Sequence, residues 1–212
     1  MTQHHQNRIV TALTVVIALS FGCAELLAQG RPVGRAAQVA AAVDAGKEVV
    51  LIRKLTGTGT DGRVKTPDYS VSSSESSRVQ DWLRVTVAYE TESEWIDELE
   101  FRYFVVVKHP KTAAFTMFTA SVTYLDIAKG KNHVSDMFLR PNTLARYGDI
   151  ERFAVEIYAK GELLASNALP NNPPNWWQGA LNVRKVEGML LNRAQTPFAL
   201  IAYDNYETIK QR

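Results

Sequence analysis

The stretch Trp95–His109, WIDELEFRYFVVVKH, decides the fold. Its residues alternate, so that one face of an extended strand carries Leu99, Phe101, Tyr103, Val105 and Val107. The other face is polar at Glu98, Glu100 and Arg102, and becomes apolar at Phe104 and Val106. A period of two that changes to a continuous apolar run predicts a strand with one half-exposed end and one end buried on both faces. We take it as the central strand of a sheet.

Other segments of the chain show the same alternation. Strands are predicted at Glu48–Leu55, Trp82–Glu90, Ala114–Ile127, His133–Arg140, Phe153–Ala159, Glu162–Asn167 and Phe198–Tyr206, with a strand interrupted by Gly188 within Leu181–Leu191. Thr91–Glu94 and Ala128–Asn132 are expected to be turns, and Lys160–Gly161 is typical of a tight hairpin. Eight or nine strands without an internal helix pattern favour an all-β fold, an antiparallel β-sandwich. A closed barrel is the alternative, since it uses the same alternation.

The beginning of the chain has the pattern of an export signal. A polar start is followed by the apolar run Ile9–Phe21 and by the small residues Gly22–Ala24. The run is shorter than the roughly 20 apolar residues of a membrane span. We therefore predict a signal peptide over residues 1–28, cut after Ala24 or Ala28. An N-terminal arm or short helix over residues 29–46 and one β-sandwich domain over residues 47–212 follow it.

Cys23 is the only cysteine of the chain. Either it is removed with the signal peptide, or it carries a lipid that anchors the protein to a membrane. The lipoprotein motif expects Leu three residues before the cysteine, where this chain has Ser20. Neither alternative provides a disulfide, so the apolar core must hold the fold without one.

The charge of the chain bears on its partners. The 24 basic and 22 acidic residues give a formal net charge of +2, with no basic block. Nucleic-acid binding is therefore not expected, because it requires a clustered basic surface. The segment Thr56–Ser77 is rich in Gly and Ser and is predicted to be a long mobile loop, above all at Ser70–Ser77.

No group of residues predicts an enzyme, a metal site or a cofactor. His109 and His133 are the only histidines beyond the signal, and neither has a second ligand at zinc-binding spacing. The serines lack the arrangement of a hydrolase nucleophile. A carboxylate cluster leaves two readings open, calcium binding or a solvated strand edge that opposes aggregation. It consists of Glu92, Glu94, Asp97, Glu98 and Glu100.

Trp176 and Trp177 are the candidate binding residues of the chain. They follow the proline-rich loop PNNPP, and aromatic side chains on such a loop suit stacking on a glycan or docking of a partner protein. In a strand the two rings would point in opposite directions, so at most one is expected to be buried. The structural alternative, that one Trp closes the end of the sandwich, is the favoured one.

The segment Asp149–Ala165, DIERFAVEIYAKGELLA, together with the export signal and the strand pattern, resembles a known family. The chain resembles the immunoglobulin-like exported protein associated with the type IV pilus-like system of Akkermansia. The resemblance extends over the mature chain and implies an immunoglobulin-like β-sandwich fold related to archaeal type IV pilin domains. It carries no functional residue to this sequence. A true pilin keeps its hydrophobic N-terminal segment, whereas cleavage is expected to remove it here, so an accessory component fits better than a major pilin.

Taken together, these features predict an exported, non-enzymatic envelope protein of the periplasm, outer membrane or cell surface. It is expected to be a pilus-associated or cell-surface component whose partners are other envelope or pilus-system proteins. The alternative is a carbohydrate-binding, adhesin-like module that binds host glycans through Trp176 and Trp177.

Overall fold

The computed structural model describes residues 49–69, 79–179 and 183–211, all of which belong to the compact unit Ala42–Arg212. The predicted signal peptide, the N-terminal arm with its helix, Cys23 and the serine-rich segment Ser70–Ser77 lie outside the described residues.

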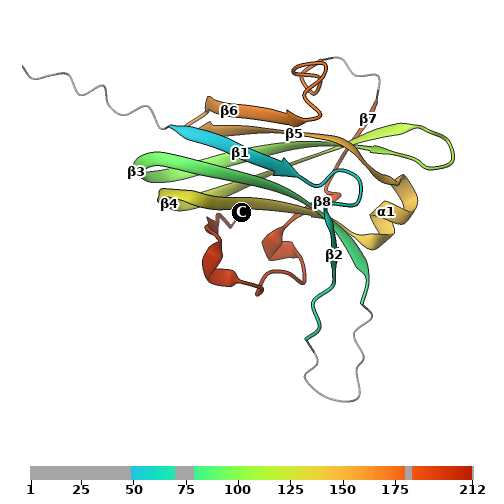
Figure 1. Ribbon diagram of the computed structural model, residues 1–212, viewed down its shortest axis with the longest axis horizontal. Coiled ribbons are helices and arrows are strands. Elements are labelled where there is room, and N and C mark those ends of the chain that lie inside the picture. Colours follow the sequence, from blue (N-terminus) through green and yellow to red (C-terminus); the bar gives the residue numbers. More distant parts are fainter. Residues whose placement is uncertain (1–48, 70–78, 180–182, 212) are drawn as a thin grey trace, which may run out of the picture. The chain divides into compact units, whose positions relative to one another are not determined.

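Nine strands form one sheet, and Figure 1 shows how the labelled strands are arranged. They are β1 (Val50–Thr56), β2 (Arg63–Lys65), β3 (Asp81–Lys108), β4 (Phe115–Leu139), β5 (Asp149–Ala159), β6 (Glu162–Leu169), β7 (Arg184–Glu187), β8 (Leu190–Asn192) and β9 (Thr208–Ile209). The order through the centre is β6-β5-β3-β4-β7; β1 and β2 also pair with β3, and β8 and β9 with β4. All pairings are antiparallel except that of β4 with β7. The predicted all-β fold is confirmed.

Two of the predicted turns do not exist. Thr91–Glu94 lies inside β3, a strand of 28 residues, and Ala128–Asn132 lies inside β4, a strand of 25 residues. The two segments face each other in the β3–β4 ladder, where the register shifts between Tyr89 and Trp95. Thr91–Glu94 contains no Gly, Pro, Asn or Asp, the strongest formers of tight turns, and paired irregularities in both strands bend the ladder instead of ending it.

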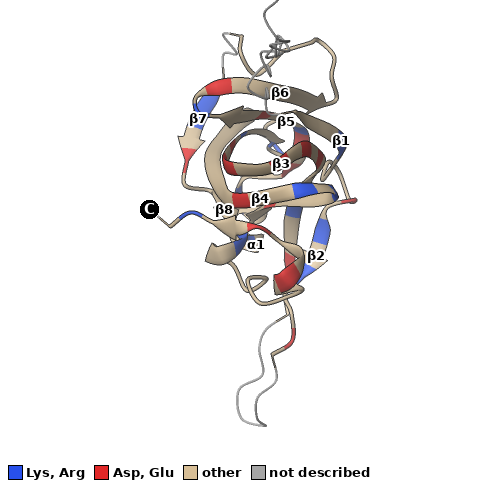
Figure 2. Ribbon diagram, turned by 90° about the vertical axis from the view of Figure 1, so that its left-hand side faces the viewer, with Lys and Arg blue, Asp and Glu red and all other residues tan. Residues whose placement is uncertain are grey.

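The bend brings the two halves of β3 face to face. The rings of Tyr89 and Phe101, twelve residues apart in one strand, have centroids 5.0 Å apart. Ile96 and Leu99 are both buried, although a spacing of three positions places two residues on opposite faces of a regular strand. Asp126 in the facing part of β4 has a φ of 54°. The single sheet therefore folds over into two packed halves, and in Figure 2 its strands surround the interior.

Both halves contribute to one core. Alternate residues of β3 and β5 lie in it, among them Leu83, Val85, Val87, Phe101, Tyr103, Val105, Phe153, Val155 and Ile157. Hydroxyl groups link the halves at the centre, where Tyr103 Oη lies 2.7 Å and Tyr124 Oη 2.9 Å from Ser135 Oγ. Burial raises the pKa of both tyrosines, so the two hydroxyls stay neutral in this core.

The hairpin at Lys160–Gly161 and the interruption at Gly188 agree with the predictions from the sequence. Lys160 and Gly161 have φ angles of 49° and 83° and join β5 to β6 in the expected hairpin. Gly188, with a φ of 76°, interrupts the strand between β7 and β8. The helix α1 (Pro141–Tyr147) follows β4 directly. Over the part of the chain that the structure describes, no helix is long and apolar enough to cross a membrane.

The predicted closing strand Phe198–Tyr206 is wrong, because this segment forms turns and a short 3-10 helix, Tyr203–Asn205. Phe198 packs outside the main core, stacked on Phe138 with ring centroids 4.8 Å apart. The chain turns at Ala202, whose φ is 48°, and Leu200 is 73% exposed. This apolar run lacks strict alternation, and it forms a loop held by one packed aromatic ring instead of a strand.

The segment Tyr206–Lys210, the C-terminal strap, spans the bend of β4. Tyr206 Oη donates to Asp136 at 2.9 Å and Glu207 Oε1 lies 2.8 Å from His133 Nδ1, both in the half of β4 that follows the bend. At the other end, the backbone N–H of Lys210 donates to the carbonyl of Thr123 at 2.8 Å. The strap therefore connects the two halves of the folded sheet.

Shortening a core side chain is expected to destabilise the protein by cavity formation. Val85→Ala and Val105→Ala should each lower the free energy of unfolding by roughly 1–3 kcal/mol in urea titrations. Val79→Ala, at a residue that is 52% exposed, is the control and should change it by less than about 0.5 kcal/mol. Equal effects of the three variants would contradict the assigned register of β3.

Gly130 tests the packing inside the bend. A Cβ at this position would lie 2.6 Å from Nε2 of His133, whose other ring nitrogen contacts Glu207. Gly130→Ala should therefore lower the melting temperature clearly. Gly179→Ala should leave it nearly unchanged, since its Cβ would meet only an atom 3.7 Å away. Similar melting temperatures for the two variants would show that the His133 ring is not fixed.

Candidate functional site

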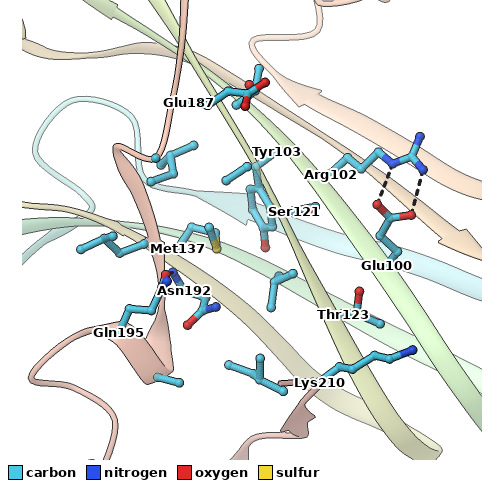
Figure 3. A pocket seen from close by; sticks show the side chains of 18 of the residues that line it. Glu100, Arg102, Tyr103, Ser121, Thr123, Met137, Glu187, Asn192, Gln195 and Lys210 are labelled. Carbon is cyan, nitrogen blue, oxygen red and sulfur yellow. Dashed lines mark hydrogen bonds and ion pairs between the residues drawn. The ribbon is translucent and has the colours of Figure 1, made fainter. Parts of the chain in front are cut away.

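The candidate site is a cleft of about 870 Å³ at the β4 edge of the folded sheet, shown in Figure 3. It extends around the edge of β4, so that side chains of both faces of the sheet line it. The inner lining is mainly apolar and includes Tyr103, Ala120, Val122, Met137, Leu190 and Ile209. The outer lining is mainly polar and includes Glu100, Arg102, Thr119, Ser121, Thr123 and Glu187.

Short strands lie at both ends of the exposed part of β4. β7 runs parallel to β4 as far as the pair Thr119–Glu187 and ends before Gly188. β9 pairs with Tyr124 and Leu125. Figure 3 accordingly shows Glu187 at one end of the cleft and Lys210 at the other, with Ser121 between them.

Charged groups around the cleft are compensated by neighbours. Arg102 donates two hydrogen bonds to the Glu100 carboxylate, at 2.9 and 2.8 Å, and its guanidinium lies 4.1 Å from the centre of the Tyr158 ring. The hydrogen bonds to Glu100 raise the pKa of Arg102 above its ordinary value. Lys210 pairs with Glu98. The cleft thus offers hydrogen-bonding groups and apolar surface rather than a strong local charge.

Trp176 and Trp177 are both buried, with 4% and 3% of their surface exposed. The expectation that at most one of them is buried is therefore wrong. The two residues belong to a turn rather than a strand, so their rings do not alternate. The rings pack edge to face against each other, and both lie in one cluster with Val106 and Met117 on the outer face of the sheet. The apolar second face of the central strand, predicted from Phe104 and Val106, is what these rings cover.

A buried carboxylate fixes this aromatic cover. Glu156 is 5% exposed and accepts hydrogen bonds from Trp177 Nε1 at 2.9 Å, Gln178 Nε2 at 2.7 Å and Tyr158 Oη at 2.8 Å. Burial by itself raises the pKa of Glu156, but the three hydrogen bonds and the charge of Arg102 outweigh it, so the pKa lies below its ordinary value. Neither indole presents the open ring face that stacking on a sugar requires.

The remaining candidates have structural roles. Glu98 and Glu100 of the carboxylate cluster are paired with Lys210 and Arg102, and no three His, Cys, Asp or Glu side chains of the described residues are grouped closely enough to hold a metal ion. His109 Nδ1 accepts the backbone N–H groups of Lys111 and Thr112, each at 3.2 Å, and so supports the turn after β3.

His133 lies between a hydroxyl and a carboxylate, the order of groups in a nucleophilic triad. Its Nε2 is 3.1 Å from Thr91 Oγ1 and its Nδ1 is 2.8 Å from Glu207. However, Thr91 is 3% exposed, and its Oγ1 already donates to the Ala128 carbonyl and accepts the Gly130 N–H. This hydroxyl holds the bulge of the bend together and has no access to a substrate.

The residues of the cleft were not predicted as a site. Ser121, Glu187 and Lys210 come from three distant segments, and no short motif links them. One feature of the sequence could have indicated the cleft: the apolar segments after Val183 are short. Short segments can pair with only parts of the edge of a long strand such as β4.

Comparison with known proteins places the chain in a family. A protein-family model matches residues 60–212, which is more than two thirds of the chain. The chain belongs to the family that this model describes. The crystal structure of a protein from Akkermansia muciniphila is similar, with a TM-score of 0.65 and 19% sequence identity over 78% of this chain and 94% of that chain. At this identity the similarity shows a common fold. No curated protein sequence matches the chain.

The Glu156 network predicts a pH-dependent stability. A carboxyl group with a lowered folded-state pKa stabilises the fold fully above its unfolded value, here 4.5, and loses that contribution as the pH falls through the folded value. Glu156→Gln should cost roughly 1–3 kcal/mol at pH 7, because its NH₂ group cannot accept the donors that face it.

Urea titrations at neutral and acidic pH measure this effect. The difference between the wild type and Glu156→Gln should shrink as the pH falls below 4.5. Glu151→Gln, at an exposed carboxylate of the same strand, is the matched control and should follow the wild type at every pH. A difference between the wild type and Glu156→Gln that does not depend on pH would contradict an ionised Glu156.

Proposed function

We propose that this chain is an exported envelope protein that acts by binding other proteins, as a pilus-associated or cell-surface component, and not as an enzyme. The observation that carries the proposal is the cleft around the β4 edge, whose lining combines backbone, polar and apolar groups. Such a surface suits recognition of polypeptide, which offers the same three kinds of group.

The side chains with reactive groups support the same proposal. The hydroxyl of Thr91 and the carboxylate of Glu156 are buried and occupied by hydrogen bonds within the fold. Arg102 and Lys210, at the cleft, are paired with Glu100 and Glu98. A protein-binding component needs no reactive group, and here these groups stabilise the sheet and its outer cover.

Export and the pilus association come from the sequence. The pattern of residues 1–28 supports secretion, and the resemblance to the exported protein of the pilus-like system of Akkermansia supports a place at the cell envelope. The fold shared with a protein from Akkermansia muciniphila is compatible with that resemblance. The glycan-binding alternative depended on Trp176 and Trp177, and their burial removes its support.

Cell fractionation with intact-mass analysis tests the proposal. We expect the protein in the envelope or outside the cell, beginning at residue 25 or 29 or carrying a lipid on Cys23. A photocrosslinking amino acid at several exposed positions should then capture specific envelope proteins. An unprocessed chain that stays in the cytoplasm would contradict the proposal, as would an envelope protein that crosslinks to nothing.

A further inference from the structure

We propose that the contact between His133 and Glu207 is a pH-sensitive switch, which holds the C-terminal strap to the bend while the His133 ring carries two protons. The ring lies between Glu207 of the strap and Thr91 of β3. Loss of one proton at rising pH breaks the contact with the strap. The inference goes beyond the proposed function and does not depend on it, because it concerns how the chain holds its own segment.

The hydroxyl group of Thr91 places a proton on one ring nitrogen. A hydroxyl has a single hydrogen, and Thr91 Oγ1 donates it to the carbonyl of Ala128 at 2.8 Å. The same oxygen accepts the N–H of Gly130 at 3.1 Å. Its contact with His133 Nε2, also 3.1 Å, is therefore a hydrogen bond in which Nε2 carries the hydrogen and donates. The hydrogen-bond network assigns this proton.

The carboxylate of Glu207 requires a proton on the other ring nitrogen. Its Oε1 lies 2.8 Å from His133 Nδ1, and an ionised carboxylate can only accept. Because Nε2 is already protonated, a neutral ring would turn the lone pair of Nδ1 toward the negative charge. A proton between the two atoms removes this repulsion and makes a charge-assisted hydrogen bond. The folded chain therefore fits an imidazolium and not a neutral imidazole.

The surroundings of the His133 ring strengthen this contact. On β3, the ring of Tyr89 stacks on it with centroids 5.1 Å apart. Burial raises the pKa of Tyr89 well above its ordinary value, so its hydroxyl stays neutral. On β4 itself, the exposed Lys131 lies two residues away, and its charge acts on Glu90. The side chains of His133 and Glu207 are only 11% and 25% exposed, so water screens their attraction in part.

The other contacts of the strap do not depend on a histidine. Tyr206 donates to Asp136, and Lys210 contacts the Thr123 carbonyl through its backbone and Glu98 through its side chain. Histidine is the side chain whose charge ordinarily changes between about pH 5 and 8. Rising pH therefore weakens the strap at Glu207 and leaves the rest of the fold intact. Because residues 209 and 210 line the cleft, a looser strap also changes the cleft lining.

His109, the other histidine of the described residues, has the opposite requirement. Its Nδ1 accepts the backbone N–H groups of Lys111 and Thr112, each at 3.2 Å. A proton on this nitrogen would break both hydrogen bonds, so the turn after β3 fits a neutral ring. The contribution of His133 to stability falls as its ring loses a proton, whereas that of His109 rises. His109 therefore serves as an internal reference.

Nuclear magnetic resonance of the ¹⁵N-labelled exported protein tests the switch. At about pH 7, both ring nitrogens of His133 should have the chemical shifts of an imidazolium, whereas Nδ1 of His109 should be unprotonated. Hydrogen exchange at the Lys210 amide, corrected for the intrinsic effect of pH, reports on the strap. Its protection should fall about tenfold between pH 6 and 9, as expected for the loss of one charged hydrogen bond. Amides of the β3–β5 ladder should keep their protection over this range.

Two substitutions locate the switch. Glu207→Gln replaces the carboxylate with an amide, which can donate to an unprotonated Nδ1, so the protection of Lys210 should no longer depend on pH. Glu98→Gln removes the charge that pairs with Lys210 and is the matched control. This variant should lower the protection at every pH and keep the pH dependence of the wild type. If Glu207→Gln does not fold, the ring shifts and the exchange of the wild type decide.

Three outcomes would overturn the inference. They are an unprotonated ring nitrogen of His133 at about pH 7, protection of Lys210 that does not change with pH in the wild type, and a folded Glu207→Gln variant that keeps the wild-type pH dependence. The proposed function is tested separately by crosslinking to envelope proteins. Crosslinked partners without a pH-dependent strap would retain the function and reject the switch, and a pH-dependent strap without partners would do the reverse.

Discussion

The fold depends on one hydrogen-bonded ladder, between β3 and β4, that bends without breaking. The irregularities of β3 and β4 lie opposite each other in the ladder, so both strands stay paired through the bend. The bend places Tyr89 against Phe101 and allows the hydroxyls of Tyr103 and Tyr124 to reach Ser135 in the opposite half. A sandwich is thereby obtained from a single sheet, with its two layers covalently continuous through two long strands.

The cleft follows from this architecture. At one edge β1 and β6 approach each other as the sheet folds over. At the other edge β4 is 25 residues long, and the segments that follow β6 cover it only in pieces, with four, three and two residues. An uncovered strand edge is a template for pairing with another chain. The same length that closes the core therefore leaves parts of this edge without a paired strand among the described residues.

Much of the fold could be predicted from the sequence, because alternation reports directly which side chains face the core. The core positions of β3 and β5 and the Lys160–Gly161 hairpin are of this kind. The bend could not be predicted, since Thr91–Glu94 resembles a polar turn. That the strand continues follows only from the pairing of Thr91 with Gly130 in the structure. Phe198–Tyr206 misled for the opposite reason: its apolar residues anchor a loop through Phe198 and leave Leu200 in solvent.

The site was less predictable than the fold. Trp176 and Trp177 were recognisable as important, but their role depends on Glu156, twenty residues earlier, which gives the Trp177 indole its hydrogen-bond partner. The local sequence does not distinguish a loop that exposes its Trp side chains from one that packs them on the sheet. The cleft itself depends on how the short strands β7 and β9 pair along the edge of β4, and the residues of β4 alone do not show this.

The most direct test of the bent ladder is a set of cross-strand nuclear Overhauser effects in the labelled protein. The account predicts contacts between Glu100 and Thr123 in one half and between Thr86 and Asp136 in the other, with extended backbone throughout Thr91–Trp95. Contacts between residues 82–90 and residues 95–104 as neighbouring antiparallel strands would contradict it. Such contacts would mean that β3 is two strands joined by a turn, and that the folded sheet and the cleft at its edge do not exist in this form.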